Sequence, residues 1–114
     1  MQIRREVSLD APVEDVWRFL ADPEELARWL GDDVRAAAVT SDEVDRRLSW
    51  TWSPNGVEST VELTVTEDGD RTCVQVVERS AGGAAATCSV ARWDGALLDL
   101  ELRALTWQHR LARV

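Results

Sequence analysis

Tryptophan is the side chain whose chemistry stands out most clearly in this sequence, because it supplies six of the seven aromatic residues. An indole offers a large apolar face and one N–H donor, so several indoles converging on a groove would suit a flat hydrophobic ligand. Trp50 and Trp52 alternate along a strand-like segment, and Trp93 lies on a helical stripe that begins at Val90. These three are the candidate pocket residues. The other three occupy helix core positions and are expected to fill the interior: Trp17, Trp29 and Trp107.

Groups for catalysis and metal binding are sparse. His109 is the single histidine, and with Arg110 and Arg113 it suits the carboxyl end of a helix, where positive charge is favourable. Cys73 and Cys88 with one histidine do not form a zinc pattern, and no glycine-rich phosphate loop is present. We therefore predict no catalytic residue, no metal and no cofactor.

Most carboxylates lie in turns or first helical turns, where solvent and the helix dipole account for them. Glu78 differs, because strict alternation points it inward if Val74 and Val76 face the core. Arg5 shows the same anomaly on the first strand. Two interpretations follow: a polar pair at the mouth of a pocket, or strand ends that twist into solvent without meeting.

The composition limits the partners and the compartment. A net charge of −8 and a pI near 4.6 disfavour nucleic acid and anionic membrane surfaces, which require clustered cations. The sequence has no apolar run near the length of a membrane span and no secretory signal, so a soluble, cytoplasmic protein with reduced cysteines is expected.

Hydrophobic periodicity predicts one α+β domain over residues 1–114, with a strand, two short helices, an antiparallel meander and a long final helix. Asp22 and Pro23 form a capped helix start, and Gly31 ends that helix. Gly95 either lies within the last helix or marks its start after Asp94. The predicted segments are 3–9, 13–20, 23–30, a weak strand at 34–39, 46–53, 60–66, 72–79 and 90–111.

The local sequence then shows a family resemblance. Ala11–Trp17 has an Ala-Pro helix start and a Val-Trp pair, Leu20–Trp29 has an Asp-Pro-Glu start ending in Trp, and Arg47–Trp52 reads Arg-Leu-Ser-Trp-Thr-Trp. These segments resemble the START-like (SRPBCC) superfamily, in particular stand-alone bacterial members of the heat-shock-protein-90 ATPase activator family. The resemblance covers nearly the whole chain.

This resemblance implies a helix-grip fold, an antiparallel sheet of four to five strands wrapped on a long C-terminal helix. Only 14 residues separate Gly31 from Arg46, where relatives usually place two strands. A smaller cavity, or one open on one side, is therefore expected. The edge left unpaired would be Arg46–Ser53 or Val34–Val39, which favours a homodimer.

Our leading hypothesis is non-enzymatic binding of a small hydrophobic molecule between the last helix and the sheet. The predicted lining residues are Trp50, Trp52, Leu63, Val74, Trp93 and Leu97. The alternative is a protein-interaction or co-chaperone-like module with a filled core, whose edge or Leu98, Leu102 and Leu105 face meets a partner. An enzyme is a third interpretation.

Overall fold

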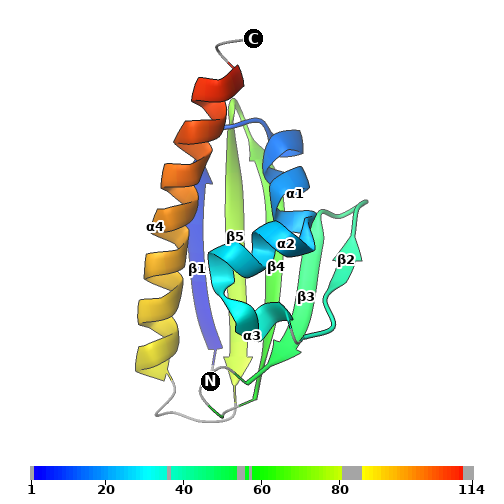
Figure 1. The fold of residues 1–114 in the computed structure, drawn as a ribbon, viewed down its shortest axis with the longest axis vertical. Coiled ribbons are helices and arrows are strands. Elements are labelled where there is room, and N and C mark those ends of the chain that lie inside the picture. Colours follow the sequence, from blue (N-terminus) through cyan, green and yellow to red (C-terminus); the bar gives the residue numbers. More distant parts are fainter. Residues whose placement is uncertain (1, 36, 54–55, 57, 81–85, 112–114) are drawn as a thin grey trace.

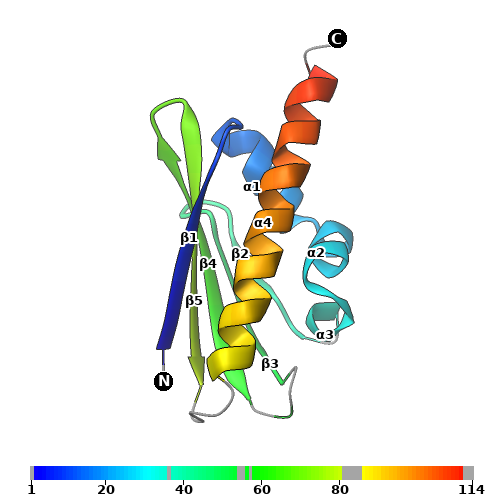
Figure 2. The same ribbon diagram turned by 90° about the vertical axis from the view of Figure 1, so that its left-hand side faces the viewer.

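A computed structural model describes residues 2–35, 37–53, 56, 58–80 and 86–111, without the side chains of residues 32, 35, 86–90 and 105–111. Five antiparallel strands form one sheet in the order β1-β5-β4-β3-β2, and the helices lie together on one of its faces (Figures 1 and 2). The predicted α+β helix-grip fold is confirmed. The elements are β1 (Gln2–Leu9), α1 (Val13–Ala21), α2 (Pro23–Leu30), α3 (Asp32–Arg35), β2 (Thr40–Asp42), β3 (Arg47–Trp52), β4 (Ser59–Asp68), β5 (Arg71–Ser80) and α4 (Ala86–Leu111).

The sheet follows from alternation, which buries every second side chain of β3, β4 and β5 against the helices. Its register brings one row across four strands. Ile3 on β1 opposes Glu78 on β5, Glu78 opposes Val61 on β4, and Val61 opposes Trp50 on β3. All four residues in this row are buried. The register therefore places a carboxylate in line with a tryptophan on the inner face.

The two short helices begin and end as the sequence predicts. The Asp22 carboxylate accepts a hydrogen bond from the Glu24 backbone N–H at 2.9 Å, and Pro23 occupies the first helical position of α2. Gly31 ends α2 with a φ of 95°, a conformation that side chains with a Cβ disfavour. These boundaries hold α1 and α2 over the inner face of the sheet (Figure 2).

The predicted weak strand at Val34–Val39 is wrong. Val34 lies in the single-turn helix α3, and the strand begins only at Thr40. The physical reason is composition, because alanine has low strand propensity and Ala36–Ala38 supplies no alternating face. A third short helix thus occupies part of the segment between Gly31 and Arg46.

The final helix runs from Ala86 through Gly95, so a start after Asp94 is wrong. It lies beside β1, and the Arg5 guanidinium meets the Asp94 carboxylate at 3.0 Å. Its buried stripe follows helical spacing: Trp93, Leu97, Leu100 and Ala104. On its other face, Leu98 and Leu102 are each 58% exposed. The final helix therefore has a core-facing stripe and an exposed apolar pair.

The prediction of which strand forms the unpaired edge of the sheet also needs correction. The sheet's outer strands are β1 and β2, and β3 lies between β4 and β2. However, β2 is three residues long and pairs only with Arg47–Ser49 of β3. The short segment after Gly31 therefore covers half of β3, and within the described residues no strand pairs with the outer side of Trp50–Trp52.

Gly95 provides a stability test of α4. A Cβ added there meets nothing within 4 Å, so Gly95→Ala should raise the free energy of unfolding by about 1 kcal/mol in urea titrations. Gly69→Ala is the control, because Gly69 has a φ of 62° and alanine there should destabilise the protein by about 1 kcal/mol. A destabilised Gly95→Ala variant would contradict a continuous α4.

Candidate functional site

Glu78 is the centre of the candidate site. Its side chain is 2% exposed, and its carboxylate accepts hydrogen bonds from three elements. The Trp52 indole N–H of β3 and the Ser59 hydroxyl of β4 donate to Oε2 at 2.8 and 2.6 Å, and the Trp93 indole N–H of α4 donates to Oε1 at 3.0 Å. One buried carboxylate thus joins two strands of the sheet to the final helix.

The indoles around Glu78 pack against one another. The Trp52 ring lies 5.6 Å from Trp50 in an edge-to-face arrangement and 6.1 Å from Trp93. Trp93 in turn meets the edge of Trp29 at 6.3 Å. Such aromatic pairs stabilise beyond the area that they bury. The four indoles form a continuous aromatic cluster that connects β3, α4 and α2.

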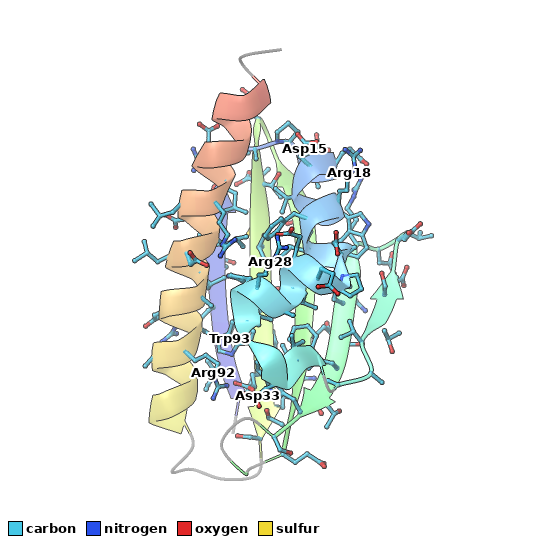
Figure 3. All side chains as sticks on the ribbon, in the orientation of Figure 1. Asp15, Arg18, Arg28, Asp33, Arg92 and Trp93 are labelled. Atoms are coloured by element: carbon cyan, nitrogen blue, oxygen red, sulfur yellow. The ribbon has the colours of Figure 1, made fainter. Side chains whose placement is uncertain are left out.

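Arg92 covers this cluster from the amino-terminal part of α4, beside Trp93 (Figure 3). Its guanidinium carbon lies 5.3 Å from the centre of the Trp52 ring, a cation–π distance. Its Nη1 atom is 3.9 Å from Glu78 Oε2, which is too long for a hydrogen bond. Arg92 therefore supplies charge to the site without closing its hydrogen-bond network.

Two buried donors in this cluster lack an acceptor among the described residues: Trp50 Nε1 and Arg92 Nη1. Trp50 is only 3% exposed. More than nine-tenths of buried polar groups in proteins have a hydrogen-bond partner, so each exception requires an explanation. Both donors belong to residues that flank the Trp52 indole.

The electrostatics of Glu78 follow from this geometry. Burial by itself raises the pKa of the carboxyl, but hydrogen bonds from Ser59, Trp52 and Trp93 and the charge of Arg92 act in the opposite direction. The net pKa lies below its ordinary value of 4.5. Glu78 is therefore an anion at neutral pH, and its lone pairs are directed to fixed donors.

The six predicted lining residues are all buried on the inner side of the molecule. Trp52 and Trp93 contact Glu78, and Trp50 packs against Trp52. The aliphatic residues belong to the same core: Leu63, Val74 and Leu97. Trp17 and Trp29 are core residues as expected. The side chains of Cys88, Leu105, Trp107 and His109 lie outside the described part of the structure.

Glu78 points inward as alternation indicated, but it does not pair with Arg5, which binds Asp94 instead. Ser59 and Arg92 were missed. Ser59 begins its strand, where alternation gives little information, and Arg92 lies outside the apolar stripe of α4. The sequence feature that could have identified Arg92 was its position next to Trp93.

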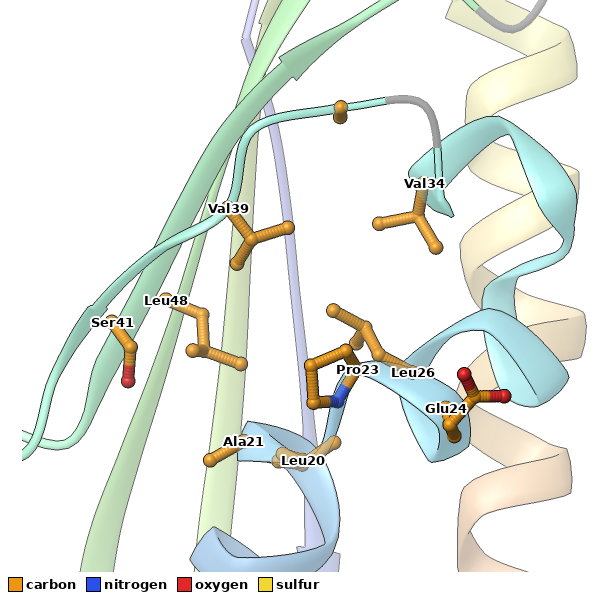
Figure 4. Close-up of a pocket in the computed structure, with 10 residues that line it drawn as sticks. Leu20, Ala21, Pro23, Glu24, Leu26, Val34, Val39, Ser41 and Leu48 are labelled. Carbon is orange, nitrogen blue, oxygen red and sulfur yellow. The ribbon is translucent and has the colours of Figure 1, made fainter.

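A cavity of about 320 Å³ lies on the opposite side of the inner face from α4, between the short helices and β2–β3 (Figure 4). Its lining contains none of the six predicted groove residues. The lining residues are Leu20, Ala21, Pro23, Glu24, Leu26, Val34, Ala37, Val39, Ser41 and Leu48.

Other candidate chemistry is limited within the described residues. Cys73 is a free thiol, and burial together with the nearby Glu6 carboxylate raises its pKa. These residues contain no cluster of three or more metal-ligating side chains. None of the helices they form has the length and apolarity needed to span a membrane.

Comparison with known proteins identifies the family. Residues 1–95 match the family described as "Polyketide cyclase / dehydrase and lipid transport". The chain belongs to this family, which is part of the SRPBCC superfamily predicted from the local sequence. No functionally curated protein matches the chain.

Solved structures share the fold. CalU16 from Micromonospora echinospora is 24% identical with a TM-score of 0.75, and the match covers 98% of this chain and 81% of CalU16. DynU16, "a putative protein in the dynemicin biosynthetic locus", is 27% identical with a TM-score of 0.67, covering 84% of this chain and 45% of DynU16. The Aha1 dimer from Colwellia psychrerythraea is 16% identical with a TM-score of 0.65, covering 89% and 93%.

Replacing Glu78 tests its structural role. Glu78→Gln keeps the shape but removes the charge and places an amide N–H₂ among donors, so the free energy of unfolding at pH 7 should fall by about 2 kcal/mol. Because the folded pKa is lowered, the wild-type contribution is complete above 4.5 and is lost as pH falls through the folded value. The difference between the two proteins should therefore shrink below pH 4.5.

Glu62→Gln is the matched control, because Glu62 is partly exposed on β4 and lies 3.5 Å from Arg47 at the surface. It should change stability by less than about 1 kcal/mol. Equal effects of the two substitutions in urea unfolding at several pH values would show that Glu78 has no special role.

Proposed function

We propose that this protein binds a small hydrophobic molecule carrying an oxygen acceptor, in the groove between α4 and the sheet. The binding residues are Trp50, Trp52, Leu63, Val74, Trp93 and Leu97, with Glu78 and Arg92 as the polar groups. The observation that carries the proposal is the Trp50 indole N–H, which is buried and has no acceptor among the described residues.

A buried donor without a partner costs roughly 1–3 kcal/mol. A ligand carbonyl, ether or phenolic oxygen beside Trp50 would recover that energy, and Arg92 Nη1 offers a second donor next to the same indole cluster. The Trp52 and Trp93 faces supply apolar area for a flat ring system. These groups together favour an aromatic molecule with a polar oxygen over a plain hydrocarbon.

Binding without catalysis is supported by the state of the carboxylate. A general base needs a lone pair directed at the substrate, whereas Glu78 already accepts three hydrogen bonds and has a lowered pKa. Its role is to orient the Trp52 and Trp93 rings. The family description includes both cyclases and lipid transport, and DynU16 is described as a protein of the dynemicin biosynthetic locus, which supports a polyketide-like aromatic ligand.

A matched pair of probes tests the oxygen requirement. Acetylnaphthalene carries a carbonyl acceptor, and ethylnaphthalene is its close hydrocarbon analogue. Isothermal titration calorimetry should show tighter binding of acetylnaphthalene, and Trp50→Phe should weaken that ligand about tenfold while leaving ethylnaphthalene unchanged. Because Trp50→Phe removes a buried donor that has no acceptor among the described residues, the free variant should be at least as stable as wild type.

Trp17→Phe is the control, because Trp17 is a buried residue of α1. The affinity of this variant for both probes should match that of wild type. The absence of saturable binding for both naphthalenes, or equal affinity of Trp50→Phe and wild type for acetylnaphthalene, would contradict the proposal.

A second candidate is an interaction module that self-associates through α4. Leu98 and Leu102 are one helical turn apart and each is 58% exposed, although large apolar side chains favour burial. Under this candidate, sedimentation equilibrium gives about twice the 12.7 kDa chain mass at micromolar concentrations, and Leu98→Gln with Leu102→Gln gives a monomer. Glu101→Gln, also on an exposed position of α4, is the control. A wild-type monomer would eliminate this candidate.

A further inference from the structure

The cavity between the short helices and β3 has a bottom and a rim of different chemistry. Its bottom is formed by four aliphatic side chains that are 0–3% exposed: Leu20, Leu26, Val34 and Leu48. Val39, Glu24 and Ser41 are exposed and form the rim. In Figure 4, Val39 and Leu48 lie across the cavity from Val34 and Leu26. The cavity therefore has an apolar bottom, and its polar groups, those of Glu24 and Ser41, lie at its rim.

The segment after Gly31 supplies part of the cavity wall. The single turn of α3 carries Val34, and the chain then crosses to a β2 strand of only three residues. This segment places Val34 and Val39 around Leu48 without a longer strand to fill the gap. The volume of about 320 Å³ is at the lower end of ligand pockets and is well above the roughly 150 Å³ of an engineered cavity that binds benzene.

The lining differs from the set of residues proposed above to bind a ligand at α4. Of the ten described residues that line the cavity, none is aromatic and eight are apolar, with Glu24 and Ser41 as the polar pair. Aliphatic walls without a ring favour an alkyl chain over a stacked aromatic molecule. The cavity is therefore a site separate from the indole cluster, with its own ligand preference.

The charge at the rim of the cavity determines which polar head group of a ligand is favoured. Among the described residues that line the cavity, Glu24 is the one carboxylate and none is an arginine. An adjoining hollow that shares Ala21 adds Glu14, Asp22 and Glu43 against the single cation Arg18, and Glu14 is paired with Arg46. With a net charge of −8 on the chain, this rim attracts cations and repels carboxylates.

We propose that this cavity binds a short aliphatic amine, with the alkyl chain between Leu26, Val34 and Leu48 and the ammonium group at Glu24. The ammonium donates hydrogen bonds to the Glu24 carboxylate, which keeps acceptor capacity beside any other contact it makes. The neutral Ser41 hydroxyl offers a second acceptor. An alkyl alcohol of the same length binds more weakly, and an alkyl carboxylate binds weakest.

The test uses three probes of equal chain length, octylamine, octanol and octanoate, added to the full chain below their micellar concentrations. Proton–nitrogen correlation spectra should show saturable shifts at the amides of Val34, Val39 and Leu48. The affinity order should be amine, then alcohol, then carboxylate. Glu24→Gln should weaken octylamine about threefold and leave octanol unchanged.

Ala37→Leu fills part of the cavity and should weaken all three probes at least about tenfold, with a wild-type-like spectrum elsewhere. Glu25→Gln is the charge control, because Glu25 is not among the lining residues and pairs with Arg28. Trp50→Phe should leave octylamine binding unchanged, so the outcome is independent of the α4 groove. The proposal would be overturned if octanoate binds as tightly as octylamine or if no probe produces a saturable shift. Shifts centred on Trp50 and Trp93 would overturn it as well.

Discussion

The hydrogen bonding of the Glu78 carboxylate is the constraint on which the inner face of this protein depends. A single buried anion on β5 accepts donors from β3, β4 and α4, and α4 otherwise meets the inner face of the sheet mainly through apolar contacts. Apolar packing tolerates small shifts of one layer over another, whereas hydrogen bonds to a carboxylate fix distance and direction. The orientation of Trp93 on the final helix relative to Trp52 on the sheet is therefore set by Glu78.

Burial of a carboxylate is costly unless its lone pairs are satisfied, and the lowered pKa of Glu78 indicates that its donors outweigh the desolvation. The same cluster nevertheless leaves Trp50 Nε1 and Arg92 Nη1 without an acceptor among the described residues. A carboxylate with satisfied hydrogen bonds beside two donors without a described acceptor is the arrangement expected of a preorganised binding site. The fixed hydrogen bonds hold the indole rings in place, and the two donors can bind a ligand.

Local patterns predicted much of this architecture. Alternation in β3, β4 and β5, the Asp22 cap and the stripe from Trp93 to Ala104 gave the elements, and alternation also pointed Glu78 inward. Its partners could not be predicted, because they depend on the register of three strands and on the rotation of α4. The prediction for the segment after Gly31 was wrong for another reason. Its alanines show no hydrophobic periodicity, so the sequence pattern did not predict α3, the short β2 or the cavity beside Leu48.

The indole N–H resonances of the tryptophans test the central role of Glu78 most directly. In proton–nitrogen correlation spectra assigned with single Trp→Phe variants, the Trp52 and Trp93 indole protons should lie downfield and exchange slowly with water, and Glu78→Gln should move both. The Trp50 indole proton should lie upfield of them, because it has no acceptor among the described residues. Trp52 and Trp93 indole protons that are unaffected by Glu78→Gln would contradict this account.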